Sequence, residues 1–171
     1  MKTYVFKPYN PIFPTLFGRE KQRIAPHLAM SFAIEHVGST AVLNLGGKGI
    51  IDIAIAVKKE DMDWASMNLQ KLGYEFRPNF STSYRFYFIA HLPDPQEGTR
   101  KYHIHLTFPG SDAWKELIGF REYFKDHPEE VLAYSELKQK IACDANQKGE
   151  RYRKVEDPMF KKISSLINKN P

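Results

Sequence analysis

A glycine–serine turn and a buried aspartate are the residues whose types and spacing most suggest chemistry. Gly38-Ser39 follows an apolar segment that ends at Val37, and Asp52 lies inside the apolar run Ile50–Val57. Such a turn supplies backbone N–H groups and a hydroxyl, which suit phosphate oxygens. A carboxylate among Ile, Ala and Val is costly unless a metal ion or a basic side chain offsets its burial. The alternative is an ordinary turn and a carboxylate that is satisfied within the fold.

Two histidines and an arginine on later segments are candidates for the same site. The segment Tyr102–Phe108 alternates, which places His103 and His105 on one face of a strand. They are either catalytic groups, with His105 also a metal ligand, or sheet-surface residues that hydrogen-bond Asp52 or a phosphate. Arg85 either binds a phosphate through two N–H groups or forms an ion pair with Asp52.

The loop between the turn and the aspartate strand adds Thr40 and Lys48 as candidates for binding phosphate or a nucleotide. Four glycines occur among residues 38–49. Lys48 either reaches a phosphate from this loop or remains solvated.

Hydrophobic patterning and the positions of glycine and proline predict the helices and strands that must position these residues. Thr15 is expected to cap the first helix, and the residues around Pro93, Pro95 and Gly98 are expected to form a mobile loop. The predicted strands cover 32–37, 50–57, 84–90 and 102–108, and later helices cover 61–72, 112–124, 128–145 and 158–168. Mixed strands and helices predict a single domain over residues 1–171 of the α/β (α+β) class, with helices against a mixed sheet and a helical C-terminal part.

Composition narrows the class of protein further. The 171 residues carry a net charge of +5, and the single Cys143 excludes an internal disulfide. No apolar run approaches the ~20 residues that a membrane helix needs. We therefore expect a soluble cytoplasmic protein without membrane contact. Seven basic and three acidic residues lie in 145–171, a segment that either binds nucleic acid or forms a solvated helix face.

Several short motifs occur in a fixed order along nearly the whole chain. They are Glu35–Val42, Lys48, Ile50–Ile53, Leu72–Tyr74, His103–His105, Pro109–Ser111, Phe120–Phe124, His127-Pro128 and Tyr134–Ala142. In this order they resemble the GrpB family, whose members are largely uncharacterised and are placed in the nucleotidyltransferase superfamily. The resemblance implies a nucleotidyltransferase-like fold with a Gly-Ser turn. It also implies strand carboxylates that hold a divalent metal such as Mg²⁺, Mn²⁺ or Zn²⁺.

One departure from the superfamily pattern bears on the reaction. Two residues after Asp52, on the same face of the strand, Ala54 replaces the expected second carboxylate. One aspartate and two histidines suit Zn²⁺ better than Mg²⁺, which prefers oxygen ligands.

The resemblance and the residues together predict a protein that binds a nucleotide or another phosphorylated ligand. Nucleotidyl transfer would be its reaction, in which Ser39 holds phosphate, Asp52 holds metal and a histidine assists proton transfer. The alternative is a non-catalytic module on the same fold that binds a ligand, a protein or a nucleic acid.

Overall fold

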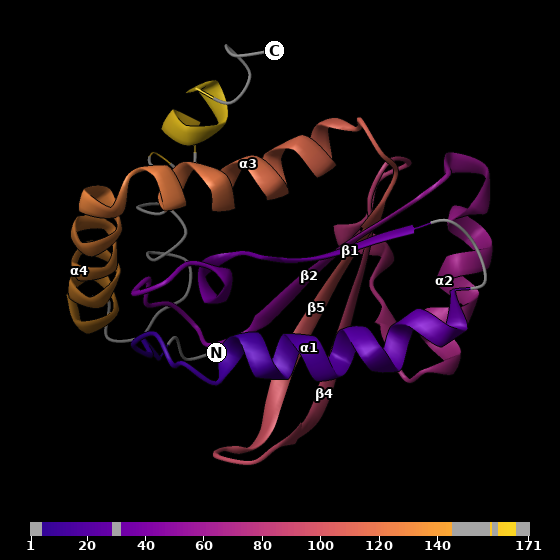
Figure 1. Ribbon diagram of the computed structural model, residues 1–171, viewed down its shortest axis with the longest axis horizontal. Coiled ribbons are helices and arrows are strands. Elements are labelled where there is room, and N and C mark those ends of the chain that lie inside the picture. The colour runs from indigo at the N-terminus through magenta and orange to yellow at the C-terminus, as the bar shows by residue number, and fades with distance from the viewer. Residues whose placement is uncertain (1–4, 29–31, 145–157, 159–160, 167–171) are drawn as a thin grey trace.

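The fold is centred on a five-stranded mixed sheet with the strand order β1-β2-β5-β4-β3 (Figure 1). The computed structural model describes residues 5–28, 32–144, 158 and 161–166. Its strands are β1 (Phe32–Val37), β2 (Ile51–Val57), β3 (Glu75–Phe76), β4 (Phe86–Asp94) and β5 (Gly98–Thr107). Its helices are α1 (Phe13–Ile24), α2 (Met62–Lys71), α3 (Asp112–Asp126) and α4 (Pro128–Asp144). This arrangement confirms the predicted α/β class.

The register of the central strands gathers the polar candidates on one face of the sheet. β2 runs parallel to β5 and pairs Asp52 with His103 and Ala54 with His105. β4 runs antiparallel to β5 and sets Tyr87 opposite His105. Because paired residues project to the same side of a sheet, the aspartate, both imidazoles and the tyrosine share a face.

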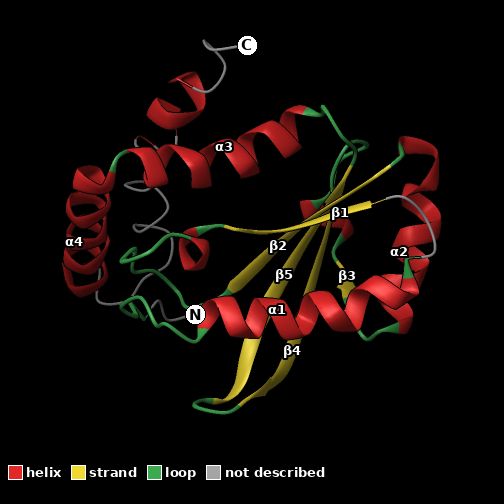
Figure 2. Ribbon diagram, in the orientation of Figure 1, coloured by secondary structure: helices red, strands yellow, loops and turns green. Residues whose placement is uncertain are grey.

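The other face of the sheet forms the main hydrophobic core. Ile51, Ile53 and Ile55 of β2 are fully buried there, because their side chains alternate with the polar ones. They belong to one cluster with apolar residues of α1 and α2, whereas α3 lies on the opposite side of the sheet (Figure 2). A second cluster joins α3, α4 and the loop after the turn through Leu45, Phe120 and Tyr134. The face that carries Asp52 thus lies below helices that belong to a separate core.

The first helix begins earlier than the sequence predicted. Its N-terminal cap is Ile12, which makes no side-chain hydrogen bond of the capping kind, so the prediction that Thr15 caps the helix was wrong. Pro14 occupies the first turn, where its fixed φ is favourable and its missing N–H costs nothing. The side chain of Asn10 instead accepts a hydrogen bond from the Ile12 N–H at 3.0 Å.

The loop predicted to be mobile is an ordered hairpin between β4 and β5. The Asp94 carboxylate accepts hydrogen bonds from the backbone N–H groups of Gln96 and Glu97, at 2.9 and 2.8 Å. Its other oxygen accepts from Arg100 Nε at 2.5 Å, and Arg100 Nη1 donates to the Gly49 carbonyl at 2.7 Å. This buried ion pair closes the hairpin and ties it to the glycine-rich loop.

The C-terminal basic segment is described only in part. Pro158 and residues 161–166 are helical, and Lys162 Nζ lies 3.4 Å from Glu130 on α4. Five of the seven basic residues of the predicted nucleic-acid segment lie outside the described residues, namely Lys148, Arg151, Arg153, Lys154 and Lys169. Within the part of the chain that the structure describes, no helix combines the length and apolar character needed to cross a membrane.

Candidate functional site

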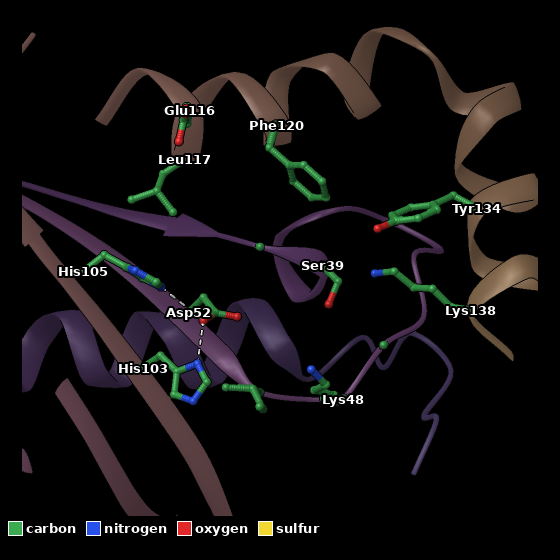
Figure 3. Close-up of a pocket in the computed structure, with 13 residues that line it drawn as sticks. Ser39, Lys48, Asp52, His103, His105, Glu116, Leu117, Phe120, Tyr134 and Lys138 are labelled. Atoms are coloured by element: carbon green, nitrogen blue, oxygen red, sulfur yellow. Dashed lines mark hydrogen bonds and ion pairs between the residues drawn. The ribbon is translucent and has the colours of Figure 1, made fainter. Parts of the chain in front are cut away.

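A cavity of about 350 Å³ lies between the polar sheet face and helices α3 and α4 (Figure 3). Six of the eight residues predicted for the site line it, namely Gly38, Ser39, Lys48, Asp52, His103 and His105. α3 contributes Glu116, Leu117 and Phe120, and α4 contributes Tyr134 and Lys138. The structure therefore brings the turn, the aspartate strand and the histidine strand together around one space.

Two glycines let backbone approach the polar side chains of the cavity. Gly38 has a positive φ of 73°, and a Cβ there would lie 2.8 Å from Asp52 Oδ2. A Cβ at Gly47 would lie 2.6 Å from Ser39 Oγ. Real Cβ atoms do not tolerate such distances, so glycine is required at both positions for this packing.

Asp52 is held by both histidines through the same oxygen. Its Oδ1 lies 2.9 Å from His103 Nδ1 and 3.4 Å from His105 Nε2. Burial would raise the pKa of Asp52, but the hydrogen bonds and electrostatic attraction from the two imidazoles outweigh it and place the pKa well below its ordinary value. Since an ionised carboxylate only accepts hydrogen bonds, both of these ring nitrogens must carry a hydrogen.

Arg85 lies on the far side of His105 and does not line the cavity. Its Nη1 is 3.5 Å from His105 Nδ1, and its Nη2 donates to the Phe80 carbonyl at 3.3 Å. Burial lowers the pKa of His105 and Arg85 acts in the same direction, although Asp52 opposes them. The imidazole is therefore neutral near pH 7, with Nδ1 facing the guanidinium. Of the two interpretations of Arg85, the ion pair with Asp52 is replaced by this contact through the histidine, and phosphate binding stays a prediction.

Thr40 faces the interior of the protein rather than the cavity. The residue is 1% exposed, and its hydroxyl donates to the Ile50 carbonyl at 3.0 Å. The same oxygen lies 3.0 Å from His36 Nε2. The Thr40 side chain therefore has a structural role, because its hydroxyl fixes the loop against the first strand, and the predicted contribution of Thr40 to phosphate binding stays a prediction.

His36 should make stability depend on pH. Burial lowers the pKa of His36 from 6.5 to about 4. The charge of Asp52 opposes this shift, and the charge of Arg121 adds to it. Between pH 4 and pH 6.5 the unfolded chain therefore binds a proton at His36 that the folded chain does not bind. The free energy of unfolding consequently falls as the pH drops from 6.5 to 4. We expect His36→Gln to remove about 3 kcal/mol of this dependence, measured by urea unfolding across that range. The same change at exposed His27 is the control, and an unaltered pH profile in His36→Gln would contradict the assignment.

Lys138 is one of the cavity residues on α3 and α4 that were not predicted from the sequence. It is 3% exposed, and its Nζ lies 4.4 Å from the Tyr134 ring centroid and 3.5 Å from the Gly46 carbonyl oxygen. Lys138 follows Tyr134 by one helical turn, so both project from one face of α4. A lysine on the buried face of a helix is the signal that could have identified it.

The donor set does not fit the metal site that the superfamily implies. Ala54 leaves Asp52 as the single carboxylate on this face of β2, and Glu35, which β1 places opposite Ala54 on the same face of the sheet, forms an ion pair with Arg121 at 2.7 Å. The hydrogen-bonding nitrogens of both imidazoles are directed at Asp52 Oδ1. Among the described residues, no group of three or more His, Cys, Asp or Glu side chains is placed to hold a metal ion. The expected Mg²⁺, Mn²⁺ or Zn²⁺ ion at Asp52 and His105 stays a prediction, which titration calorimetry would test.

Comparisons with known proteins agree with the motif order. The family model described as GrpB protein matches residues 4–165. A UPF0157 protein of Pseudomonas aeruginosa is 32% identical over 158 residues, which cover 91% of this chain. A UPF0157 protein of Deinococcus radiodurans is 33% identical over 138 residues, or 78% of this chain. The matched regions span 64% and 66% of the lengths of these two relatives.

The fold itself also has a solved counterpart. The crystal structure of the conserved protein GrpB from Enterococcus faecalis superimposes with a TM-score of 0.81 at 27% sequence identity. The match covers 96% of this chain and 98% of that one.

Proposed function

The chain belongs to the GrpB family, and on that premise we propose that its cavity binds a phosphorylated small molecule such as a nucleotide. The observation that carries the proposal is the grouping of Ser39, Lys48 and Lys138 at one end of the cavity, on the glycine–serine turn, the glycine-rich loop and α4 (Figure 3). The loop that begins at the turn and a helix far along the chain thus supply two cations and a hydroxyl to one place.

The packing at this basic end suits the oxygens of a phosphate. The position of an ideal Cβ on Gly47 is 2.6 Å from Ser39 Oγ and 3.9 Å from Lys138 Nζ. The hydroxyl, the ammonium and the glycine backbone are therefore neighbours. Ammonium groups and hydroxyls donate charge-assisted hydrogen bonds to phosphate, and partial burial strengthens these bonds by excluding water.

Binding without transfer is the activity that this site favours. Nucleotidyl transfer by two metal ions needs several carboxylates to bridge the ions, and Ala54 leaves Asp52 alone on its face of β2. Transfer is a second proposal, supported by the ionised Asp52, which lines the same cavity. Release of pyrophosphate from a nucleoside triphosphate would establish it.

Lys138→Met tests the proposed binding. We expect the melting temperature of the unmodified protein to rise with AMP, ATP or inorganic phosphate, because a ligand at a hundredfold excess over Kd stabilises by about 2.7 kcal/mol. In Lys138→Met the affinity should fall about tenfold to a hundredfold, since a hydrogen bond to a charged group contributes about 1.5–3 kcal/mol.

Lys140→Met is the matched control, because Lys140 lies on the same helix but is exposed. It should leave the ligand-induced shift unchanged. Absence of any shift with phosphorylated compounds, or equal shifts in both variants, would contradict the proposal.

A further inference from the structure

Resting on the proposed function, the geometry points to a narrower class of ligand, a phosphomonoester whose far end carries hydroxyl groups, as in a sugar or ribose phosphate. We infer that its phosphate lies at Ser39, Lys48 and Lys138, and that a hydroxyl donates a hydrogen bond to Asp52 Oδ2. The observation behind this inference is that the two oxygens of one carboxylate have different surroundings.

The first oxygen of Asp52 is used within the protein. Oδ1 accepts from both His103 and His105, so these hydrogen bonds orient the carboxylate. The other oxygen points along the cavity toward Ser39 in Figure 3. It lies against Gly38, where any Cβ would come within 2.8 Å of it. The side chain as a whole is 21% exposed, and Oδ2 is the oxygen that remains for a ligand.

At Asp52 the cavity presents a hydrogen-bond acceptor to a ligand. A carboxylate that accepts hydrogen bonds from two imidazoles is ionised at neutral pH, and an ionised carboxylate has no hydrogen to donate. The ring N–H groups beside it are already directed at Oδ1. A ligand group placed here must therefore donate, and an O–H···O⁻ hydrogen bond is of the strong, charge-assisted kind. Ribose hydroxyls are recognised by carboxylates in this manner in dinucleotide-binding folds.

The remaining walls and the size of the cavity fit a compact ligand of this class. Leu117 and Phe120 of α3 form an apolar wall, against which the C–H face of a sugar ring can pack. The volume of about 350 Å³ lies near the lower end of the range of roughly 300–1,000 Å³ for ligand pockets. The cavity thus combines a basic end, an acceptor end and an apolar wall.

Two probes of equal charge test the inference on the unmodified protein. Ribose 5-phosphate and butyl phosphate share the phosphomonoester, but only the sugar carries hydroxyl donors. In EDTA, titration calorimetry should show that ribose 5-phosphate binds at least about tenfold more tightly, as one charge-assisted hydrogen bond provides. This comparison requires no variant and so does not depend on the folding of a mutant.

Asp52→Asn then locates the contact. The asparagine oxygen can still accept from His103 and His105, while an NH₂ donor replaces Oδ2 at nearly the same shape. The variant should lose the preference for ribose 5-phosphate and retain its affinity for butyl phosphate. Asp63→Asn, at an exposed position on α2, should behave like the unmodified protein.

Each contrary result has a distinct meaning. Equal affinity for the two probes, or a preference that survives in Asp52→Asn, would overturn this inference and leave the proposed function standing. A requirement for Mg²⁺ before ribose 5-phosphate binds would also overturn it, because a metal would then occupy the place of the hydroxyl. Absence of binding by every phosphorylated probe would refute the proposed function itself, and this inference with it.

Discussion

Arg100→Met is expected to lower the free energy of unfolding by about 3–5 kcal/mol, the usual range for breaking a buried ion pair by removing one partner. The Arg100 and Asp94 side chains are 1% and 0% exposed, and 2.5 Å separates Nε from Oδ2. Methionine would fill much of the volume but leave the carboxylate with two backbone N–H donors and no cation. The Gly49 carbonyl would also lose its donor. Urea unfolding at pH 7 measures the change.

Lys7→Met is the matched control for the same hairpin. Lys7 forms an ion pair with Glu97, but the two side chains are 36% and 32% exposed, so its loss should cost less than about 1 kcal/mol. The double variant Arg100→Met with Asp94→Leu should recover part of the lost stability, since no charge is then left buried. A cost below about 1 kcal/mol for Arg100→Met alone would show that water reaches Asp94 and that the pair does not close the hairpin.

Gly38→Ala should abolish most of the ligand response of the cavity. A Cβ on a residue with φ of 73° and ψ of −170°, a conformation that essentially only glycine adopts, costs about 1–3 kcal/mol, and its position 2.8 Å from Asp52 Oδ2 forces the turn or the carboxylate to move. Movement of the turn displaces Ser39 from the lysines, and movement of the carboxylate changes the wall of the cavity beside them. We expect phosphate affinity to fall about a hundredfold, the equivalent of one or two charge-assisted hydrogen bonds, measured by titration calorimetry.

Gly73→Ala separates backbone strain from the effect on the site. Gly73 has a φ of 90° at the end of α2, yet a Cβ there would meet no atom within 4 Å. This variant should lose similar stability through strain and keep its affinity for phosphate. If both variants bind equally well, the close approach of Gly38 to Asp52 is irrelevant to the ligand.

Local sequence patterns were sufficient to predict the strands that carry the site. The apolar run around Asp52 and the alternation around His103 each depend on neighbouring residues, and strand periodicity alone then places the side chains on a face. The turn at Gly38 is similarly local, because its glycine and serine are adjacent. These predictions needed no knowledge of which strands pair, although the pairing of β2 with β5 completes the geometry.

Contacts between distant segments were not accessible in this way. One of the two interpretations of Arg85 was an ion pair with Asp52, but the His105 ring lies between them, which depends on the packing of β4 beside β5. Thr40 has the residue type of a phosphate ligand, yet its hydroxyl is used by the Ile50 carbonyl. The hairpin was predicted as a mobile loop because proline and glycine are typical of loops. Its order comes from Arg100, whose partner Gly49 is 51 residues away.

The parallel pairing of β2 with β5 makes the site sensitive to the number of residues inserted into β5. An odd number and an even number have different effects. His103 and His105 are two residues apart on β5, so their side chains project from the same face of the strand. They pair with Asp52 and Ala54 and therefore reach the cavity. Inserting one residue between the Arg100 anchor and His103 would turn Tyr102 or Ile104 toward the cavity and both imidazoles into the apolar core. Inserting two would restore the facing side chains. Among natural or engineered variants of this stretch, those that retain the imidazoles at Asp52 should therefore differ in length by even numbers.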